Sequence, residues 1–391
     1  MKPGYKKTEV GVIPEEWEVG RTCDLIFKMK SGLSRRLQAH DIGIPVLTSA
    51  NIQNNRLVTD ELKYWYLDDP QGADVGNYVL NNGDILLCFI NSMAQIGKPC
   101  VFRDIGRPVI YTTNIFRIVT SKECVSDFAF YLFSSTTFQE ALQLVAKPAV
   151  NQASFTKPDF FHINIVIPPL PEQQAIAEAL SDVDGLLGAL DRLIAKKRDL
   201  KQAAMQQLLT GQTRLPGFEG EWETKRLGDV LTICHGRSQH EVQVENGPYP
   251  ILATGGEIGT ACRFLYDEPS VLIGRKGTID QPQYMDTPFW TVDTLFYSAI
   301  RDGNNAKFFF YRFCLIEWKQ YNEASGVPSL NARTIENITV DCPKPDEQKA
   351  IAEILSEMDL ELAGLEERRA KTRALKQGMM QELLTGKTRL V

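Results

Sequence analysis

Residues 171–215 read PEQQAIAEALSDVDGLLGALDRLIAKKRDLKQAAMQQLLTGQTRL, and residues 346–390 read DEQKAIAEILSEMDLELAGLEERRAKTRALKQGMMQELLTGKTRL. At an offset of 175 positions the two stretches align without a gap, and 26 of the 45 aligned positions are identical. Self-similarity of this kind means that one structural unit occurs more than once in a chain. The sequence therefore predicts a tandem duplication, in which each half consists of a variable part followed by the repeated segment.

The repeated segment has the pattern of a long helix with one apolar stripe. Apolar residues recur in the first copy at alternating spacings of four and three, and the second copy keeps the same phase. This is the a/d pattern of a coiled coil. A helix over 172–209 would be ~57 Å long. We expect the two helices to pack against each other through a seam formed by Ile176, Leu180, Leu187, Leu190, Ile351, Leu355, Leu362 and Leu365.

Proline-rich stretches divide the chain into four segments, 1–170, 171–215, 216–342 and 343–391. The two variable parts, 1–170 and 216–342, combine short β-type runs bounded by Gly, Asn and Asp with later helical stretches. The fold class that we predict is α+β, with two α/β domains separated by two long helices in a pseudo-twofold duplication. The expected strands are 84–90, 115–119, 270–273 and 295–300, and the expected domain helices are 127–144 and 306–321.

Charge, cysteine and hydropathy patterns limit the classes of function. The chain of 391 residues has a formal net charge of −6, and no segment is basic enough to indicate a nucleic-acid domain by charge alone. The eight cysteines form no C-x-x-C pair, and the four histidines form no metal motif, so we expect no metal site. Neither a membrane span of ~20 apolar residues nor a signal peptide is visible, and we expect a cytoplasmic protein without membrane contact.

Motifs for catalysis are missing or incomplete. The glycine-rich run at 255–259 lacks the Gly-Lys-Ser/Thr of a phosphate-binding loop, and no methyltransferase motif has its flanking residues. A nuclease motif could be assigned to 345–349, but that string opens a predicted helix. Its counterpart in the first repeat, which starts at Pro171, has no lysine. Acidic residues at a helix N-terminus are the simpler explanation. The sequence indicates a binding scaffold and not an enzyme.

These features together resemble the specificity subunit of type I restriction-modification systems. The resemblance is carried by the order of variable domain, long helix, variable domain and long helix. It is also carried by Pro-Leu-Pro-Glu-Gln-Gln-Ala-Ile-Ala at 169–177 and by Leu-Leu-Thr-Gly-x-Thr-Arg-Leu at 208–215 and 383–390. It covers the whole chain. The resemblance implies that each variable domain is a target-recognition domain for one half of a split, asymmetric site in double-stranded DNA, and that the two helices form an antiparallel spacer.

The resemblance also implies the partners of the chain. Two modification (methyltransferase) subunits would dock on the helices, where the seam residues are the candidates for partner docking, and restriction (nuclease and translocase) subunits would join them. Catalysis would belong to these partners, which would carry S-adenosylmethionine, ATP and Mg²⁺, while this chain would hold no cofactor. Partners that close around the duplex would also supply much of the phosphate neutralisation that this near-neutral chain lacks.

Candidate DNA-reading residues are the polar and basic side chains of loops that occupy equivalent places in the two halves, because such side chains read base edges. An ordinary solvated loop residue is the alternative for about half of them, and each Arg or Lys could equally contact a phosphate. The candidates are Ser34, Arg35, Arg36, Asn91, Ser92, Gln95, Lys98, Asn151, Gln152, Ser154, His235, Arg237, Ser238, Gln239, Arg275, Lys276, Thr278, Ser329, Asn331 and Arg333.

Two other interpretations stay open from the sequence. One is the specificity chain of a different restriction-modification architecture, which would be distinguished by the neighbouring genes. The other is a coiled-coil adaptor whose variable domains bind protein. An adaptor would leave no sequence-specific methylation in a cell that expresses it, so a methylome with and without the chain separates these readings.

Overall fold

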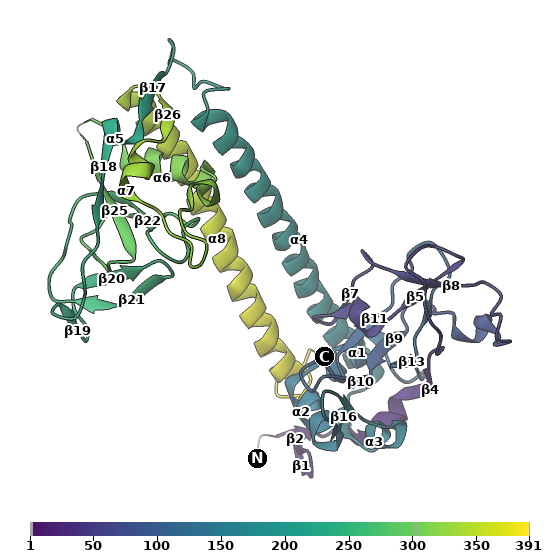
Figure 1. Cartoon of the computed structure of the whole chain (residues 1–391). Coiled ribbons are helices and arrows are strands. Elements are labelled where there is room, and N and C mark those ends of the chain that lie inside the picture. Colours follow the sequence, from purple (N-terminus) through teal and green to yellow (C-terminus); the bar gives the residue numbers. More distant parts are fainter. Residues whose placement is uncertain (1–2, 302, 391) are drawn as a thin grey trace. The chain divides into compact units, whose positions relative to one another are not determined.

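A computed structural model describes residues 3–301 and 303–390 of the chain, which fold into two compact units. The first unit comprises Met1–Ala189 and Arg369–Val391, and the second comprises Leu190–Arg368. Each unit therefore holds one variable domain together with one end of both long helices, as the colours in Figure 1 show.

The two repeated segments form the long helices α4 (Leu170–Leu209) and α8 (Pro345–Leu383), as predicted. Seven of the eight predicted seam residues are buried and Leu365 is half-buried. Each unit has a main core that includes helix residues from both repeats. Leu180 and Leu383 belong to the core of the first unit, and Leu209 and Leu355 belong to that of the second. No helix among the described residues is both long enough and apolar enough to cross a membrane.

Ion pairs join α4 and α8 in each unit. In the second unit they show that the helices run antiparallel, because Lys197 pairs with Glu361 while Lys201, later on α4, pairs with a residue earlier on α8. In the first unit, Lys376 Nζ near the end of α8 lies 2.7 Å from Asp184 Oδ1 near the start of α4. In the second unit, Lys201 near the end of α4 pairs with Asp359 near the start of α8. Asp359 is the repeat counterpart of Asp184, and Lys376 is that of Lys201, so the same two repeat positions pair in both units. The helix duplication is thus also a duplication of contacts.

The two variable domains share the order of their main sheet and of three strands of a second sheet, to which the second domain adds β19, although their sequences differ. In each domain the main sheet is antiparallel throughout, and a second sheet contains one parallel pair. The strands of the first domain's two sheets are, in order, β11 (Pro99–Val101), β9 (Ile85–Cys88), β13 (Ile115–Thr120) and β4 (Ile26–Ser31), then β12 (Ile110–Tyr111), β5 (Ile44–Leu47) and β8 (Lys63–Trp65). Those of the second domain are β23 (Gln283–Met285), β22 (Ser270–Gly274), β25 (Leu295–Ile300) and β18 (Leu231–His235), then β24 (Trp290–Thr291), β20 (Tyr249–Ala253), β21 (Gly256–Ala261) and β19 (Gln243–Val244).

Shorter elements complete the two domains. The remaining strands are β1 (Tyr5–Thr8), β2 (Gly11–Pro14), β3 (Glu18–Arg21), β6 (Ile52–Gln53), β7 (Arg56–Leu57), β10 (Ile90–Asn91), β14 (Lys147–Pro148), β15 (Ala153–Ser154), β16 (Asn164–Ile167), β17 (Glu223–Arg226) and β26 (Thr339–Cys342). The remaining α-helices are α1 (Ser126–Ser134), α2 (Thr136–Val145), α3 (Lys157–Phe161), α5 (Leu227–Val230), α6 (Ala306–Leu315) and α7 (Ala332–Glu336).

The predicted domain helices are shorter than we expected. The stretch predicted as one helix over 127–144 is two helices, because Ser135 leaves the helical region at ψ 147° and its Oγ caps α2 by accepting from the Phe138 amide. The stretch predicted over 306–321 ends as an α-helix at Leu315, and a 3₁₀ turn follows at Trp318–Tyr321. A local side-chain cap decides the first of these boundaries, which the apolar pattern alone does not.

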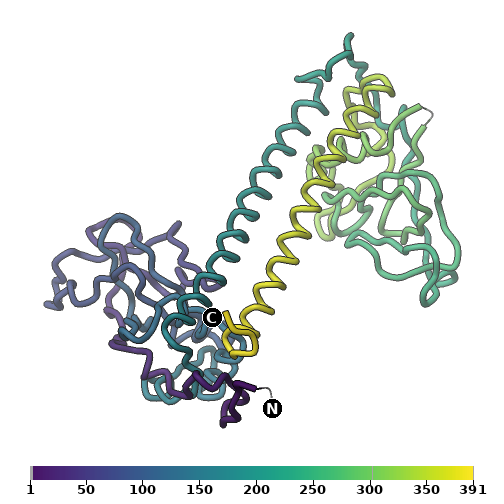
Figure 2. Tube along the Cα trace, turned by 180° about the vertical axis from the view of Figure 1, so that it is seen from behind, coloured from purple at the N-terminus to yellow at the C-terminus, as the bar shows by residue number. Residues whose placement is uncertain are grey.

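A buried glutamate joins the start of α4 to the end of the C-terminal repeat in the first unit. Glu172 has no exposed surface; its carboxylate accepts a hydrogen bond from Trp17 Nε1 at 2.7 Å and another from Arg389 Nε at 2.5 Å. Gly386, at φ 69°, places this end of the chain against Pro14, where a Cβ would approach the proline Cδ to 2.5 Å. Figure 2 shows the end of α8 beside the N-terminal strands.

The second unit repeats the same connection with the roles of the two helices exchanged. Glu347 at the start of α8 is 2% exposed and accepts two hydrogen bonds from Arg214, each 2.6 Å long, and one from Trp222 Nε1 at 3.2 Å. A bidentate Arg–carboxylate pair of this kind fixes geometry as well as charge. Glu347 belongs to the string 345–349 that was considered above for a nuclease motif. Its carboxylate is instead occupied in joining the ends of the two repeats.

Candidate nucleic-acid interface

Two polar loops of the first domain meet one short segment, residues 111–114, and a third loop joins them through strand pairing. Loop A (31–36) follows β4, and the Leu33 amide donates to the Tyr111 carbonyl at 2.8 Å. Loop B (91–98) follows Phe89, whose amide donates to the Asn114 carbonyl at 3.1 Å. Loop C (147–157) joins loop B because β15 pairs with β10, with Ser154 opposite Ile90. The fold thus brings together three candidate loops that are far apart in the sequence.

The second domain arranges its three loops in the same way. The amide of Arg237, in loop A′ (235–239), donates to the Thr291 carbonyl at 2.8 Å. In loop B′ (275–278), the Arg275 amide donates to the Thr294 carbonyl at 2.8 Å. Loop C′ (325–333) meets loop B′ through a bridge between Ser329 and Lys276, and the Gly277 amide donates to the Pro328 carbonyl at 2.9 Å. Two different sequences therefore build one arrangement of loops.

Glycine allows the first loop of each domain to approach its neighbour closely. A Cβ on Gly32 would lie 2.0 Å from the Tyr111 carbonyl oxygen, and a Cβ on Gly236 would lie 2.0 Å from the Val292 carbonyl oxygen. No side chain can occupy that space, so the backbone contact depends on glycine at both positions. The match between the domains indicates that loops A and A′ occupy equivalent positions.

Twelve of the twenty candidate residues expose their side chains, and the other eight are half-buried. The exposed ones are Ser34, Arg36, Ser92, Gln95, Asn151, Gln152, His235, Arg237, Ser238, Lys276, Asn331 and Arg333. The half-buried ones are Arg35, Asn91, Lys98, Ser154, Gln239, Arg275, Thr278 and Ser329. All belong to the six loops, so each domain gathers its own candidates around one surface region.

Arg35 is already engaged inside the first domain. Its Nε lies 3.1 Å from Asp69 Oδ1, and the Asp69 side chain has no exposed surface. Hydrogen bonds from Arg35, Trp65 and the Ala73 amide hold the pKa of the Asp69 carboxyl well below its ordinary value. A base contact by Arg35 would leave this buried carboxylate without its main partner, so the arrangement favours a structural role for Arg35. The sequence holds no local sign of this pairing, because the residues are 34 positions apart.

Local bonds also occupy two candidates in the second domain. The Asn331 side chain accepts from the Arg333 amide at 2.9 Å and caps α7. Arg275 donates through Nη1 to the Asp293 carbonyl at 3.1 Å, whereas Lys276 beside it is exposed. Lys276 is therefore better placed than Arg275 to contact a ligand from outside.

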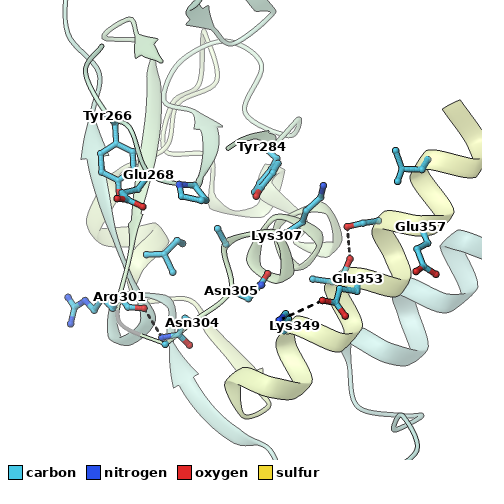
Figure 3. A pocket seen from close by; sticks show the side chains of 17 residues that line it. Tyr266, Glu268, Tyr284, Arg301, Asn304, Asn305, Lys307, Lys349, Glu353 and Glu357 are labelled. Carbon is cyan, nitrogen blue, oxygen red and sulfur yellow. Dashed lines mark hydrogen bonds and ion pairs between the residues drawn. The ribbon is translucent and has the colours of Figure 1, made fainter. Parts of the chain in front are cut away.

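A hollow of about 800 Å³ opens in the second unit between the variable domain and α8 (Figure 3). Its labelled charged side chains balance, with Glu268, Glu353 and Glu357 against Arg301, Lys307 and Lys349. Lys349 lies 4.0 Å from Glu353 on the same helix. The lining has neither cysteine nor histidine. Among the described residues, no three His, Cys, Asp or Glu side chains gather as a metal site.

The model of the family "Type I restriction modification DNA specificity domain" matches residues 14–196 and 219–372. Among curated proteins, the chain is 27% identical to a putative type I restriction enzyme MjaX specificity subunit of Methanocaldococcus jannaschii, over 99% of this chain and 97% of that one. It is 19% identical to the type I restriction enzyme EcoKI specificity subunit of Escherichia coli, over 63% of this chain and 54% of that one.

Solved structures share the fold. The S subunit of a type I restriction-modification system from M. genitalium superposes with a TM-score of 0.66 at 16% identity, over 98% of this chain and 99% of that one. A second structure, from work on complex assembly and conformational transition of the type I system, gives a TM-score of 0.57 at 16% identity, over 96% and 99% of the two chains. The arrangement of two domains and two long helices is thus a known one.

Proposed function

The chain belongs to the type I restriction-modification DNA specificity family, and from this premise we propose that its two variable domains read the two halves of a split, asymmetric DNA site. As a specificity subunit the chain recognises the DNA target and assembles the complex. It is a non-catalytic subunit, and in this family the cofactors belong to partner subunits.

The observation that carries the proposal is the equivalent convergence of loops A, B and C and of loops A′, B′ and C′. The backbone contacts agree between the domains, while the side chains differ, with Asn151 and Gln152 in one loop C and Val327 and Pro328 in the other. One scaffold with two sets of side chains is suited to reading two different base sequences. The half-sites would therefore differ, and the target would be asymmetric.

Two modification subunits would dock on equivalent helix faces of the two units. The seam residues are mostly buried within the chain and so are not free to contact a partner directly. They could affect docking only by fixing the positions of the two helices. Exposed leucines offer direct contacts instead: Leu200 and Leu375 are matching repeat positions and are 47% and 59% exposed. Restriction subunits would join this assembly, and ATP, Mg²⁺ and S-adenosylmethionine would be held by the partners. A cytoplasmic location follows from the same proposal, since the DNA target must be reached there.

Methylation mapping tests the proposed function directly. A host without type I methylation would express the modification subunit with and without this chain. We expect methylation at one bipartite sequence only when both are present. Methylation without sequence preference, or none at all with both subunits folded and bound, would contradict the proposal and favour the adaptor interpretation.

Substitution of Lys276 by Ala should weaken or relax recognition of the second half-site. A lost base contact costs about 1–3 kcal/mol and relaxes one position, whereas a lost phosphate contact weakens all sequences alike. Arg275→Ala should have the smaller effect, because Arg275 is half-buried and hydrogen-bonded to a carbonyl. Arg301→Ala is the matched control. Loop B′ contacts Thr294, just before β25 begins, whereas the exposed Arg301 follows the last residue of β25. Methylation that is unchanged for Lys276→Ala in rate and site would remove loop B′ from the interface.

Charge at one matched leucine should remove one partner. We expect Leu200→Asp or Leu375→Asp to reduce the bound modification subunits from two to one, because a carboxylate cannot be covered by an apolar partner surface without cost. Native mass spectrometry of the assembled complex measures this number. Leu360→Asp is the control: its repeat counterpart is Gly185, so it cannot belong to a surface that occurs twice. Two bound partners in both test variants would place docking elsewhere.

A further inference from the structure

The first domain carries a small β-hairpin where the second domain has only a tight turn. In the first domain, β5 and β8 are joined by residues 48–62, which include the paired strands β6 and β7. In the second domain, the corresponding strands β20 and β21 are joined by Thr254 and Gly255 alone. The hairpin is therefore an addition to one member of a duplicated pair of domains.

The hairpin has a defined conformation. Asn54 and Asn55 form its tip with positive φ values of 51° and 61°, as a two-residue type I′ turn requires. Asn51 at its base is 5% exposed, and its Nδ2 donates to the carbonyls of Val58 at 2.9 Å and Glu61 at 3.0 Å. A tip held by a buried amide presents its side chains in a fixed place.

The two tip amides are available to a ligand. The Asn54 side chain is exposed and that of Asn55 is half-buried, and neither forms a hydrogen bond with a residue that the structure describes. The neighbouring Gln53 is different, because its Nε2 already donates to the Ala50 carbonyl at 2.9 Å. Asn54 and Asn55 thus carry the amides of this hairpin that could bind a base outside the chain.

The hairpin lies beside loop B. Strand β7 packs against β11, as Figure 1 also shows, and β11 begins at Pro99, directly after loop B ends. The short turn of the second domain lies beside loop B′ in the same way. Gln283 Nε2 donates to the Ala253 carbonyl at 2.9 Å, and Thr254 Oγ1 is 3.7 Å from the place of a Cβ on Gly277. The hairpin therefore lies next to the strand that follows loop B.

We propose that Asn54 and Asn55 are specificity-determining residues that bind adenine in the major groove at the edge of the first half-site. This inference rests on the proposed function of the domain. An asparagine amide donates to adenine N7 and accepts from adenine N6, a pairing that no other base offers in that groove. The second domain has no such element within its described residues, so the first half-site includes a base pair that has no counterpart in the second.

The test uses the full chain in complex with its modification subunit. Asn54→Gly and Asn55→Gly remove an amide but keep the turn, because glycine adopts positive φ without strain. For at least one of them we expect discrimination at one adenine of the first half-site to fall roughly 5- to 150-fold. Methylation mapping gives the preference at each position, and competition binding with target duplexes gives its size.

Target duplexes with 7-deazaadenine at one position at a time identify the contacted base. Removal of N7 should weaken binding of the unchanged complex at one adenine of the first half-site and leave the corresponding glycine variant unaffected there. Asn246→Gly is the matched control, since Asn246 is an exposed asparagine of the second domain with φ 59°. This control should keep the preference at the first half-site.

The outcomes separate this inference from the proposed function. Unchanged preference in both glycine variants, with normal bipartite methylation, would overturn the hairpin assignment and leave the proposed function intact. An equal loss of affinity for all sequences would also overturn it, because that is the behaviour of a phosphate contact. If the complex without substitutions showed no sequence-specific methylation, that result would instead contradict the proposed function itself.

Discussion

Leu355→Asp should lower the free energy of unfolding of the second unit by about 3–5 kcal/mol, the cost that an unpaired buried charge commonly brings. Leu355 has no exposed surface and belongs to the core in which both helices and the variable domain meet. Even the uncharged variant Leu355→Ala should cost about 2–5 kcal/mol through the cavity that it leaves.

Leu360, five residues later on the same helix, is the matched control because it is 74% exposed. Leu360→Asp should change stability by less than about 0.5 kcal/mol. Calorimetry of the full chain measures both variants, and the transition of the first unit should stay where it is. Equal stability of Leu355→Asp and Leu360→Asp would show that the seam contributes little to the fold.

A fragment of residues 1–215 should form a twofold dimer. It contains the first variable domain and α4, but it lacks the end of the C-terminal repeat that the first unit uses in the full chain. The end of the first repeat has the same apolar residues, since Leu208 and Leu209 match Leu383 and Leu384. A second copy can therefore cover the exposed core, and a pseudo-twofold interface becomes an isologous one.

The polar contacts support this exchange. In the full chain, Glu172 binds Arg389, and Arg214 binds Glu347. In the dimer, Glu172 of one copy would bind Arg214 of the other. Arg214 is the repeat counterpart of the lost Arg389, and Glu172 is that of the lost Glu347. Asp184 and Lys201 would replace the other ion pairs in the same way. The Glu–Arg and Asp–Lys pairs at the helix ends thus each have a substitute at the same repeat position.

Such a dimer should modify a palindromic site, made of the first half-target and its inverted copy, once the modification subunit is added. Analytical ultracentrifugation tests the dimer, and methylation mapping tests the site. Arg214→Ala in the fragment should weaken dimerisation, while the same change at the exposed Arg36 should not. A fragment that dimerises and binds its partner yet methylates the original asymmetric site would refute the assignment of one domain to each half-site.

Several features of this protein follow from the sequence alone. The repeat at an offset of 175, the helices over its two copies and the seam of Ile176, Leu180 and their counterparts could all be predicted. These features depend on residues that are neighbours along the chain, where a helical period of 3.6 places every third or fourth side chain on one face. Strands such as β13 and β25 could be located from β-type runs bounded by Gly, Asn and Asp, whereas the break at Ser135 depended on a local cap.

Only the tertiary structure decided how separated residues meet. The pairing of Glu172 with Arg389 joins positions 217 apart, and Arg35 finds Asp69 across 34 positions. The sequence shows which side chains can form ion pairs, but not which ones the backbone brings within reach. The same holds for the interface. The loops could be proposed from their polarity, but their convergence arises from strand pairing, and the Asn54–Asn55 hairpin is found beside loop B only because β7 packs on β11.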